Sequence, residues 1–165
     1  MNRSKIPVTP DPARPVPSGC SNFKLHQLMR QFDQFYDAEL ARAGMKTTQY
    51  SLLTHVVRLG PVRPGALAQA MKMQPSTLTR NLQPLVRSGW VEVNAGSDAR
   101  SRSVTATDAG REKRVQAQRH WKQAQQQINR VLGETRVVAL HAQLEQALEL
   151  LTAHGQPEEC TRHGP

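Results

Sequence analysis

Residues 64–107 read PGALAQAMKMQPSTLTRNLQPLVRSGWVEVNAGSDARSRSVTAT, and their periodicity changes midway along the stretch. Its first half contains two short apolar series at helical spacing, one after Pro64 and one after Pro75, with a turn at residues 72–74 between them. Both prolines suit the first turn of a helix, and Gly89 suits the end of the second one. The sequence therefore predicts two short helices, 64–71 and 75–88, joined by a tight turn.

The second half of the stretch changes from helical to alternating periodicity. Val91 and Val93 alternate with polar neighbours, a Gly-Ser turn follows at residues 96–97, and residues 103–106 alternate again. This pattern predicts a short β-hairpin with Arg100 and Arg102 at its tip. Two helices at a tight turn, followed by a hairpin with a basic tip, predict a winged helix-turn-helix.

Helical periodicity continues on both sides of this unit. Amphipathic helices are predicted over residues 22–43 and 47–59 before it, and two more over 108–132 and 134–153 after it. The fold class is therefore mainly α, in the order α-α-α-α-β-β-α-α. We expect a proline-rich flexible arm at 1–19, one domain at 20–153 and a flexible tail at 154–165. Within the domain, residues 47–107 form the winged unit.

Composition sets limits on the class of protein. The chain has 165 residues, enough for one domain, with 38% hydrophobic and only 4% aromatic residues, which favours a helical core. No apolar run approaches the length of a membrane span, and residues 1–19 lack the apolar segment of a secretory signal. Two distant cysteines exclude a disulfide scaffold or a metal knuckle. We expect a cytoplasmic protein with no membrane association, no cofactor and no metal.

The distribution of charge points to an anionic partner. The net charge is +9, and no Asp or Glu occurs between Glu39 and Glu92, where seven Lys and Arg residues occur: Arg42, Lys46, Arg58, Arg63, Lys72, Arg80 and Arg87. A region without carboxylates avoids repulsion from a phosphate backbone.

The helix at 75–88 has the side chains that a DNA-reading helix needs. The major groove of B-DNA admits one α-helix, whose exposed N-terminal side chains reach the base edges. Small polar groups and one guanidinium are the candidates here: Ser76, Thr77, Thr79, Arg80, Asn81 and Gln83. Arg100, with Arg102 beside it, is a candidate for the minor groove, whose negative potential attracts a guanidinium. Pro84 has no backbone N–H to donate to the Arg80 carbonyl, so we expect a continuous helix that bends after Arg80.

Four pieces of sequence occur in a fixed order: Leu67-Ala68-x-x-Met71, STLTRNLQPLVRSGWV at residues 76–91, Asp98-x-Arg100, and Val104-x-x-Thr107-x-x-Gly110. In this combination they resemble the MarR family of bacterial transcription regulators, and the resemblance covers about residues 22–151. It implies an obligate homodimer on a palindromic operator. It also implies a repressor that a small aromatic or anionic effector releases from double-stranded DNA.

The terminal helices have apolar stripes that fit a dimer. The stripes of residues 20–43 and 108–153 are too long for the small winged unit to cover alone, so they need a partner surface. The last helix repeats Val137, Leu140, Leu144, Leu148 and Leu151 at coiled-coil-like spacing. A seam within one chain is the alternative interpretation of that repeat.

The resemblance also suggests candidates for regulation. An effector between the dimer helices and the winged unit would meet His26 and Arg30 on the first helix and His55 on the second. Cys20 lies close to the position where the peroxide-sensing branch of the family has its reactive cysteine, although that branch has Phe directly after it and Asn22 precedes Phe23 here.

Other classes of function have less support. The sequence contains no nucleophile–base pair, glycine-rich phosphate loop or carboxylate dyad, so we do not expect an enzyme. A basic RNA-binding or protein-interaction module without sequence readout is the alternative. The aromatic strands that stack single-stranded bases are absent from the sequence.

Overall fold

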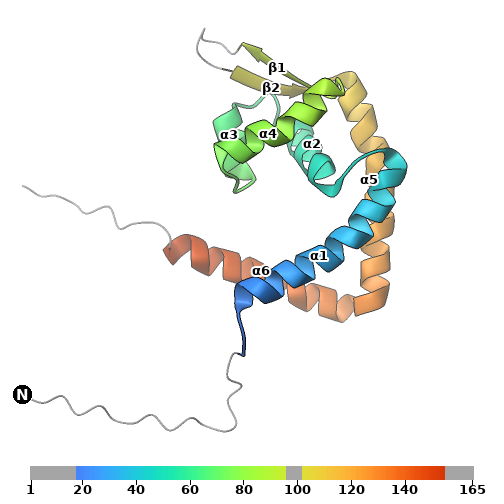
Figure 1. Cartoon of the computed structure of the whole chain (residues 1–165), viewed down its shortest axis with the longest axis vertical. Helices are drawn as coiled ribbons and strands as arrows, with labels where there is room; N and C mark the ends of the chain where they lie inside the picture. Colours follow the sequence, from blue (N-terminus) through green and yellow to red (C-terminus); the bar gives the residue numbers. More distant parts are fainter. Residues whose placement is uncertain (1–17, 96–101, 155–165) are drawn as a thin grey trace, which may run out of the picture.

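The computed structural model describes residues 18–95 and 102–154. In chain order the elements are α1 (Ser21–Leu40), the 3-10 helix η1 (Ala41–Ala43), α2 (Thr47–Leu59), α3 (Pro64–Ala70), α4 (Pro75–Arg87), β1 (Val91–Ala95), β2 (Arg102–Ala106), α5 (Asp108–Leu132) and α6 (Glu134–His154) (Figure 1). The predicted order is confirmed. The predicted arm and tail, apart from residues 18, 19 and 154, lie outside the described residues, as does Arg100.

The first predicted helix differs slightly from the structure at its end. Its last residues tighten into η1, and Gly44 follows with a φ of 63°, the left-handed conformation that glycine adopts without steric cost. The helix 75–88 is confirmed as α4, which runs through Pro84 to Arg87 without interruption. The expected bend after Arg80 stays a prediction.

A compact core holds the winged unit together. Its fully buried leucines and valines come from the end of α1, from α2, α3 and α4, and from both strands: Leu40, Leu52, Leu53, Val56, Leu67, Leu78, Leu85, Val91 and Val104. Burial of each such side chain contributes about 1.5–3 kcal/mol. The core therefore fixes α4 and the hairpin relative to one another.

The hairpin is a two-stranded antiparallel sheet. Its register pairs Val91 with Ala106 and Ala95 with Arg102. Val62, which precedes α3, adds a bridge to Val104, with Val62 N donating to Val104 O at 3.1 Å and Val104 N donating back at 2.9 Å. This bridge joins the α2–α3 connection to the wing, and the period-2 pattern of the sequence did not predict it.

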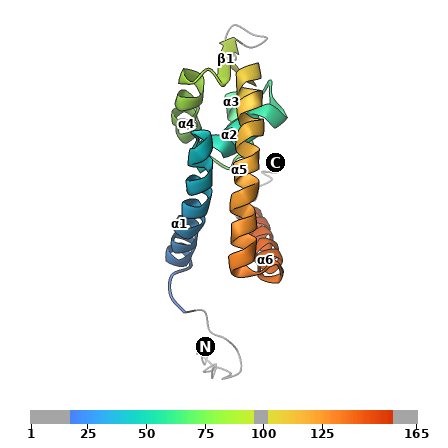
Figure 2. The ribbon, with the colours of Figure 1, turned by 90° about the vertical axis from the view of Figure 1, so that its right-hand side faces the viewer.

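Helices α1 and α5 lie side by side and extend away from the winged unit (Figure 2). Ala117, Ala124 and Ile128 are buried on α5, whereas the apolar residues of the first half of α1 are exposed. Gly133 ends α5 with a φ of 81°, and α6 follows with Val137 as its only buried residue. No described helix is long and apolar enough to cross a membrane.

Candidate nucleic-acid interface

Helix α4 has one buried and one polar face. Leu78, Leu82 and Leu85 are buried at the steps of three and four that a helix face requires. The predicted DNA-reading residues lie elsewhere on the helix, with Ser76, Thr79, Arg80 and Gln83 exposed and Thr77 and Asn81 half-buried. The structure therefore brings all six onto one element and leaves four of them open to a partner.

The turn before α4 sets its direction. Lys72 has a φ of 52°, and the turn closes through Lys72 N to Gln69 O at 3.0 Å and Met73 N to Ala68 O at 2.9 Å. Helix α4 begins at Pro75, and Gln74 makes no side-chain cap bond. The first-turn amides that α-helices leave without an internal partner are therefore not capped by the Gln74 side chain.

A groove of about 590 Å³ separates α4 from the wing. Thr79 and Gln83 line it from the helix, and Val93 and Arg102 line it from the strands. Arg102 is exposed at the start of β2. Helix face, groove and wing thus form one surface, with a guanidinium on the helix at Arg80 and another on the wing at Arg102.

A hydrogen-bonded joint connects α4, the hairpin and α5. The Thr107 hydroxyl donates to Gly89 O at 2.7 Å and accepts from Gly110 N at 3.0 Å, while Thr107 N donates to Trp90 O at 3.1 Å. A side chain at Gly110 would place a Cβ 2.0 Å from Trp90 O. Since no such approach is possible, only glycine fits, and the end of α4 is held firmly against the start of α5.

A second, partly open pocket lies between α1, α2 and α5. It is a cavity of about 440 Å³ with walls that include Tyr36, Tyr50 and Trp121. The Trp121 ring lies 6.3 Å from each of the two tyrosine rings, centroid to centroid. The Tyr36 hydroxyl donates to Gln125 Oε1 at 2.5 Å, and burial raises the pKa of this phenol. The tyrosine therefore stays neutral at physiological pH.

Two polar atoms at this cavity have no partner within the described chain. Thr54 Oγ1 and Arg114 Nε are both buried without a hydrogen bond, and both residues line the cavity. Arg114 Nη1 donates to Gln118 Oε1 at 3.0 Å, which holds the guanidinium in place. Buried polar groups normally find partners, so the arrangement fits a ligand that supplies a hydrogen-bond acceptor.

The structure separates the three predicted effector residues. His55 lines the cavity, and its Nδ1 lies 2.8 Å from Ser51 O. His26 and Arg30 are exposed on the first half of α1 and do not line it. Sequence reasoning missed Thr54 and Arg114, because spacing alone does not show which polar side chains of α2 and α5 turn inward.

Cys20 lies at the beginning of α1, and Trp90 lies between α4 and β1. Cys20 is exposed and free at the N-cap of α1. Trp90 packs against the core, with Lys113 Nζ 5.3 Å from the centre of its ring.

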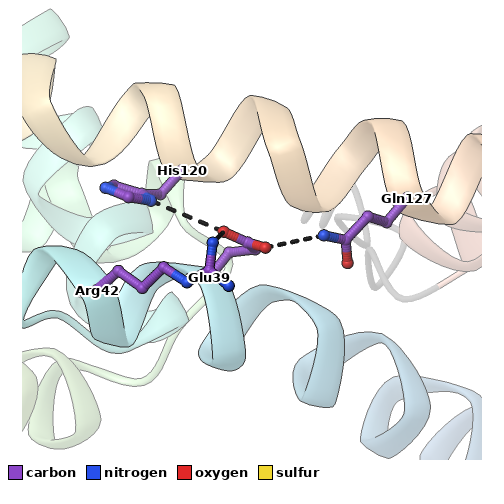
Figure 3. A network of polar contacts seen from close by, with 4 residues as sticks. All are labelled: Glu39, Arg42, His120 and Gln127. Carbon is purple, nitrogen blue, oxygen red and sulfur yellow. Dashed lines mark hydrogen bonds and ion pairs between the residues drawn. The ribbon is translucent and has the colours of Figure 1, made fainter.

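A buried carboxylate joins α1 to α5 (Figure 3). Glu39 is only 5% exposed, and its Oε1 accepts from Gln127 Nε2 at 2.8 Å. Its Oε2 lies 3.1 Å from Arg42 Nη1 and 3.7 Å from His120 Nδ1. The last acidic residue before the carboxylate-free region is therefore a structural contact between two helices.

Helix, turn, helix and hairpin wing define the class of this protein as winged helix-turn-helix. A model of the MarR family matches residues 43–101, from the end of η1 into the hairpin. The Mycobacterium tuberculosis transcriptional regulator MosR, solved in complex with DNA, is 32% identical, with a TM-score of 0.68 over 81% of this chain and 98% of that one. The chain belongs to the MarR family of transcription regulators.

Two further relatives extend the comparison. A mutant of Escherichia coli MarR, solved with operator DNA, has a TM-score of 0.70 at 23% identity, covering 77% of this chain and 92% of that chain, and it supports the fold. The HTH-type transcriptional regulator YwoH of Bacillus subtilis is 24% identical over 90 residues. That alignment covers 54% of this chain and 66% of YwoH, slightly less than two thirds of its length.

Proposed function

We propose that this protein is a homodimeric repressor that binds a palindromic operator in double-stranded DNA and leaves it when a small aromatic anion binds. The observation that supports DNA binding most directly is the polar face of α4. Ser76, Thr79, Arg80 and Gln83 are exposed there beside a basic wing, in a region without a carboxylate from Leu40 to Val91. MosR and E. coli MarR, which share the fold, were solved with DNA.

The exposed apolar faces support the dimer. Phe23 and Met29 on α1 are 58% and 57% exposed, and Leu148 and Leu151 on α6 are 62% and 70% exposed. Side chains of this size at helical spacing would leave a large apolar surface in water. A second copy of the chain that presents the same helices covers both faces at once, as a two-fold interface requires.

The cavity between α1, α2 and α5 supports the effector. Its aromatic walls suit a planar ring, and Arg114 suits a carboxylate. A ligand that contacts Thr54 and Arg114 bridges α2, which packs in the winged unit, to α5, which belongs to the long helical region. The ligand would therefore favour one orientation of the winged unit relative to the long helices. DNA affinity falls when the two winged units of the dimer, in that orientation, no longer match the spacing of the two half-sites.

Selection of bound duplexes from random DNA tests the DNA-binding proposal. We expect enrichment of an inverted repeat, because two symmetric copies read two symmetric half-sites. Competition with structured RNA should leave the enriched duplex bound. Enrichment of no sequence, or equal competition by RNA, would support the module without sequence readout instead.

Benzoate is a suitable first probe for the effector site, with benzyl alcohol as its uncharged counterpart. We expect benzoate to raise the melting temperature of the protein and to weaken operator binding, whereas benzyl alcohol does neither. The Arg114→Gln variant should lose the response, and the Arg119→Gln variant, which removes an exposed arginine from the same helix, should keep it. A response that survives in Arg114→Gln places the effector elsewhere.

A further inference from the structure

We propose that Thr79 reads a base by its exocyclic amino group, and so selects adenine or cytosine at one symmetric position of the operator. This inference rests on the proposed binding of DNA by α4. It follows from the direction in which the Thr79 hydroxyl already donates its proton, which limits what the side chain offers to a base.

The hydroxyl proton of Thr79 forms a hydrogen bond within the helix. Thr79 Oγ1 donates to Pro75 O at 2.9 Å, one turn earlier in α4. A hydroxyl has one proton and two lone pairs, so Thr79 keeps only its acceptor lone pairs for another partner. The residue is exposed and lies one turn after Ser76 on the same helix face. It therefore presents an oriented acceptor near the beginning of α4.

The other polar side chains of α4 are not limited in this way. Among residues 18–95 and 102–154, the side chains of Ser76, Thr77, Asn81 and Gln83 form no hydrogen bond. Their donors and acceptors are both free to adapt to a base. Thr79 is thus the residue of this helix whose hydroxyl is already restricted to accepting a hydrogen bond before DNA binds.

The major groove offers a matching code. Adenine presents its N6 amino group and cytosine its N4 amino group as donors, whereas guanine and thymine present O6, N7 or O4 as acceptors. An amino group can donate to the free lone pairs of Thr79. A guanine or thymine acceptor would face those lone pairs, unless the hydroxyl turns and gives up its bond to Pro75. We expect a preference of about fivefold per half-site, the size of one net hydrogen bond.

Three proteins test this preference: the wild type, Thr79→Val and Thr79→Ser. Valine keeps the branched shape and a methyl group but has no acceptor, and serine keeps the hydroxyl that bonds one turn back. Base preferences across the operator should be the same in wild type and Thr79→Ser. In Thr79→Val the preference for adenine or cytosine should disappear at one symmetric position only. The Ser76→Ala variant should change a different position.

A base analogue tests the contribution of the exocyclic amino group alone. At the affected position, purine replaces adenine, or 2-pyrimidinone replaces cytosine, which removes the amino group and keeps the ring. On this substitution the affinity of the wild type should fall about fivefold more per half-site than the affinity of Thr79→Val. The comparison is a double-mutant cycle, so the effect of the weaker base pair, which both proteins experience, cancels. Equal losses in both proteins overturn the inference.

The remaining outcomes are also decisive. A thymine preference that Thr79→Val retains would mean that the methyl group is read, and a preference for guanine would mean that the hydroxyl donates. Either result overturns the inference while DNA binding stands. Failure of the wild type to select any duplex overturns the proposed function itself, which the random-DNA selection shows before any Thr79 variant is made.

Discussion

We expect Arg80 and Arg102 to contact DNA in two different ways. Arg80 is exposed on α4, one turn after Ser76, where a guanidinium can bond to O6 and N7 of a guanine. Arg102 is the first residue of β2 on the wing, two residues after Arg100, the candidate for the minor groove. The first contact would distinguish bases, and the second would respond to the backbone and groove shape.

Replacement of Arg80 with alanine should reduce operator affinity by about 1–3 kcal/mol and relax base preference at one symmetric position. Arg102→Ala should weaken binding to all sequences more evenly and make its salt dependence shallower, because fewer counterions are released. Affinities of both variants on single-base operator mutants measure the difference. If Arg80→Ala keeps the wild-type preference profile, Arg80 contacts only phosphate.

Two glycines on different helices offer a matched test of packing. Gly110 faces Trp90 O so closely that a Cβ has no room, whereas a Cβ on Gly65 in α3 would meet nothing within 4 Å. Gly110→Ala should lower the free energy of unfolding by about 1–3 kcal/mol through overpacking. Gly65→Ala should raise it by about 0.5–1 kcal/mol through helix propensity. Denaturant unfolding at one protein concentration measures both, and an unchanged Gly110→Ala would mean that the joint is loose.

Contacts between elements explain how the long helices stay in place. Glu39 on α1 bonds to Gln127 on α5, and its second oxygen faces Arg42 and His120. Removal of this carboxylate leaves the amide of a part-buried glutamine without its acceptor, a cost that exceeds the gain of one ordinary surface ion pair.

Glu39→Ala should therefore lower the free energy of unfolding by about 1–3 kcal/mol. Arg42→Ala should change it by less than about 0.5 kcal/mol, because the arginine side chain is 66% exposed and solvent screens its pair with Glu39. Thermal or denaturant unfolding of the two variants, compared at equal protein concentration, checks the contrast. Equal effects would contradict this account, because they would mean that the bond between the helices at Gln127 stabilises the fold no more than the exposed ion pair within the α1–η1 segment.

Element types were more predictable from the sequence than the contacts between them. The leucine spacing of α4, the glycines that end the helices and the alternation of Val91 and Val93 are local signals, and they gave the correct order. The effector candidates show the limit of such signals. His26 and His55 both occur in stretches with helical periodicity, but of the two only His55 lines the cavity, because α2 turns that face toward α5 and the first half of α1 lies away from it.

In the molecule as a whole, one copy of the chain leaves a large apolar surface uncovered. Its winged unit has a closed core, whereas α6 contributes one buried residue and exposes most of its leucines. A domain that buries its apolar residues at one end and exposes them at the other needs a partner at the exposed end. We expect the two copies to join through α1, α5 and α6 and to present their α4 helices on one side.

The double variant Leu144→Glu and Leu148→Glu should disrupt this association. Both leucines are exposed on α6 of the single chain, by 37% and 62%, and two carboxylates would have to enter the interface. Sedimentation should then show a monomer with greatly reduced operator affinity. The matched control, Gln143→Glu with Gln146→Glu, adds the same charge to α6 and should remain dimeric. Dimerisation of the leucine variant would mean that α6 lies outside the interface.

The spacing of the half-sites tests whether the two winged units of a dimer bind the operator together. If two copies of α4 enter successive major grooves, their half-sites lie about 34 Å, or one helical turn, apart on one face of the duplex. Insertion of about five base pairs between the half-sites rotates one of them to the opposite face by half a turn. The affinity of the wild-type protein for this duplex, compared with the selected operator, should fall to that for unrelated DNA. Unchanged affinity would contradict the claim, because it would mean that each winged unit binds its half-site alone.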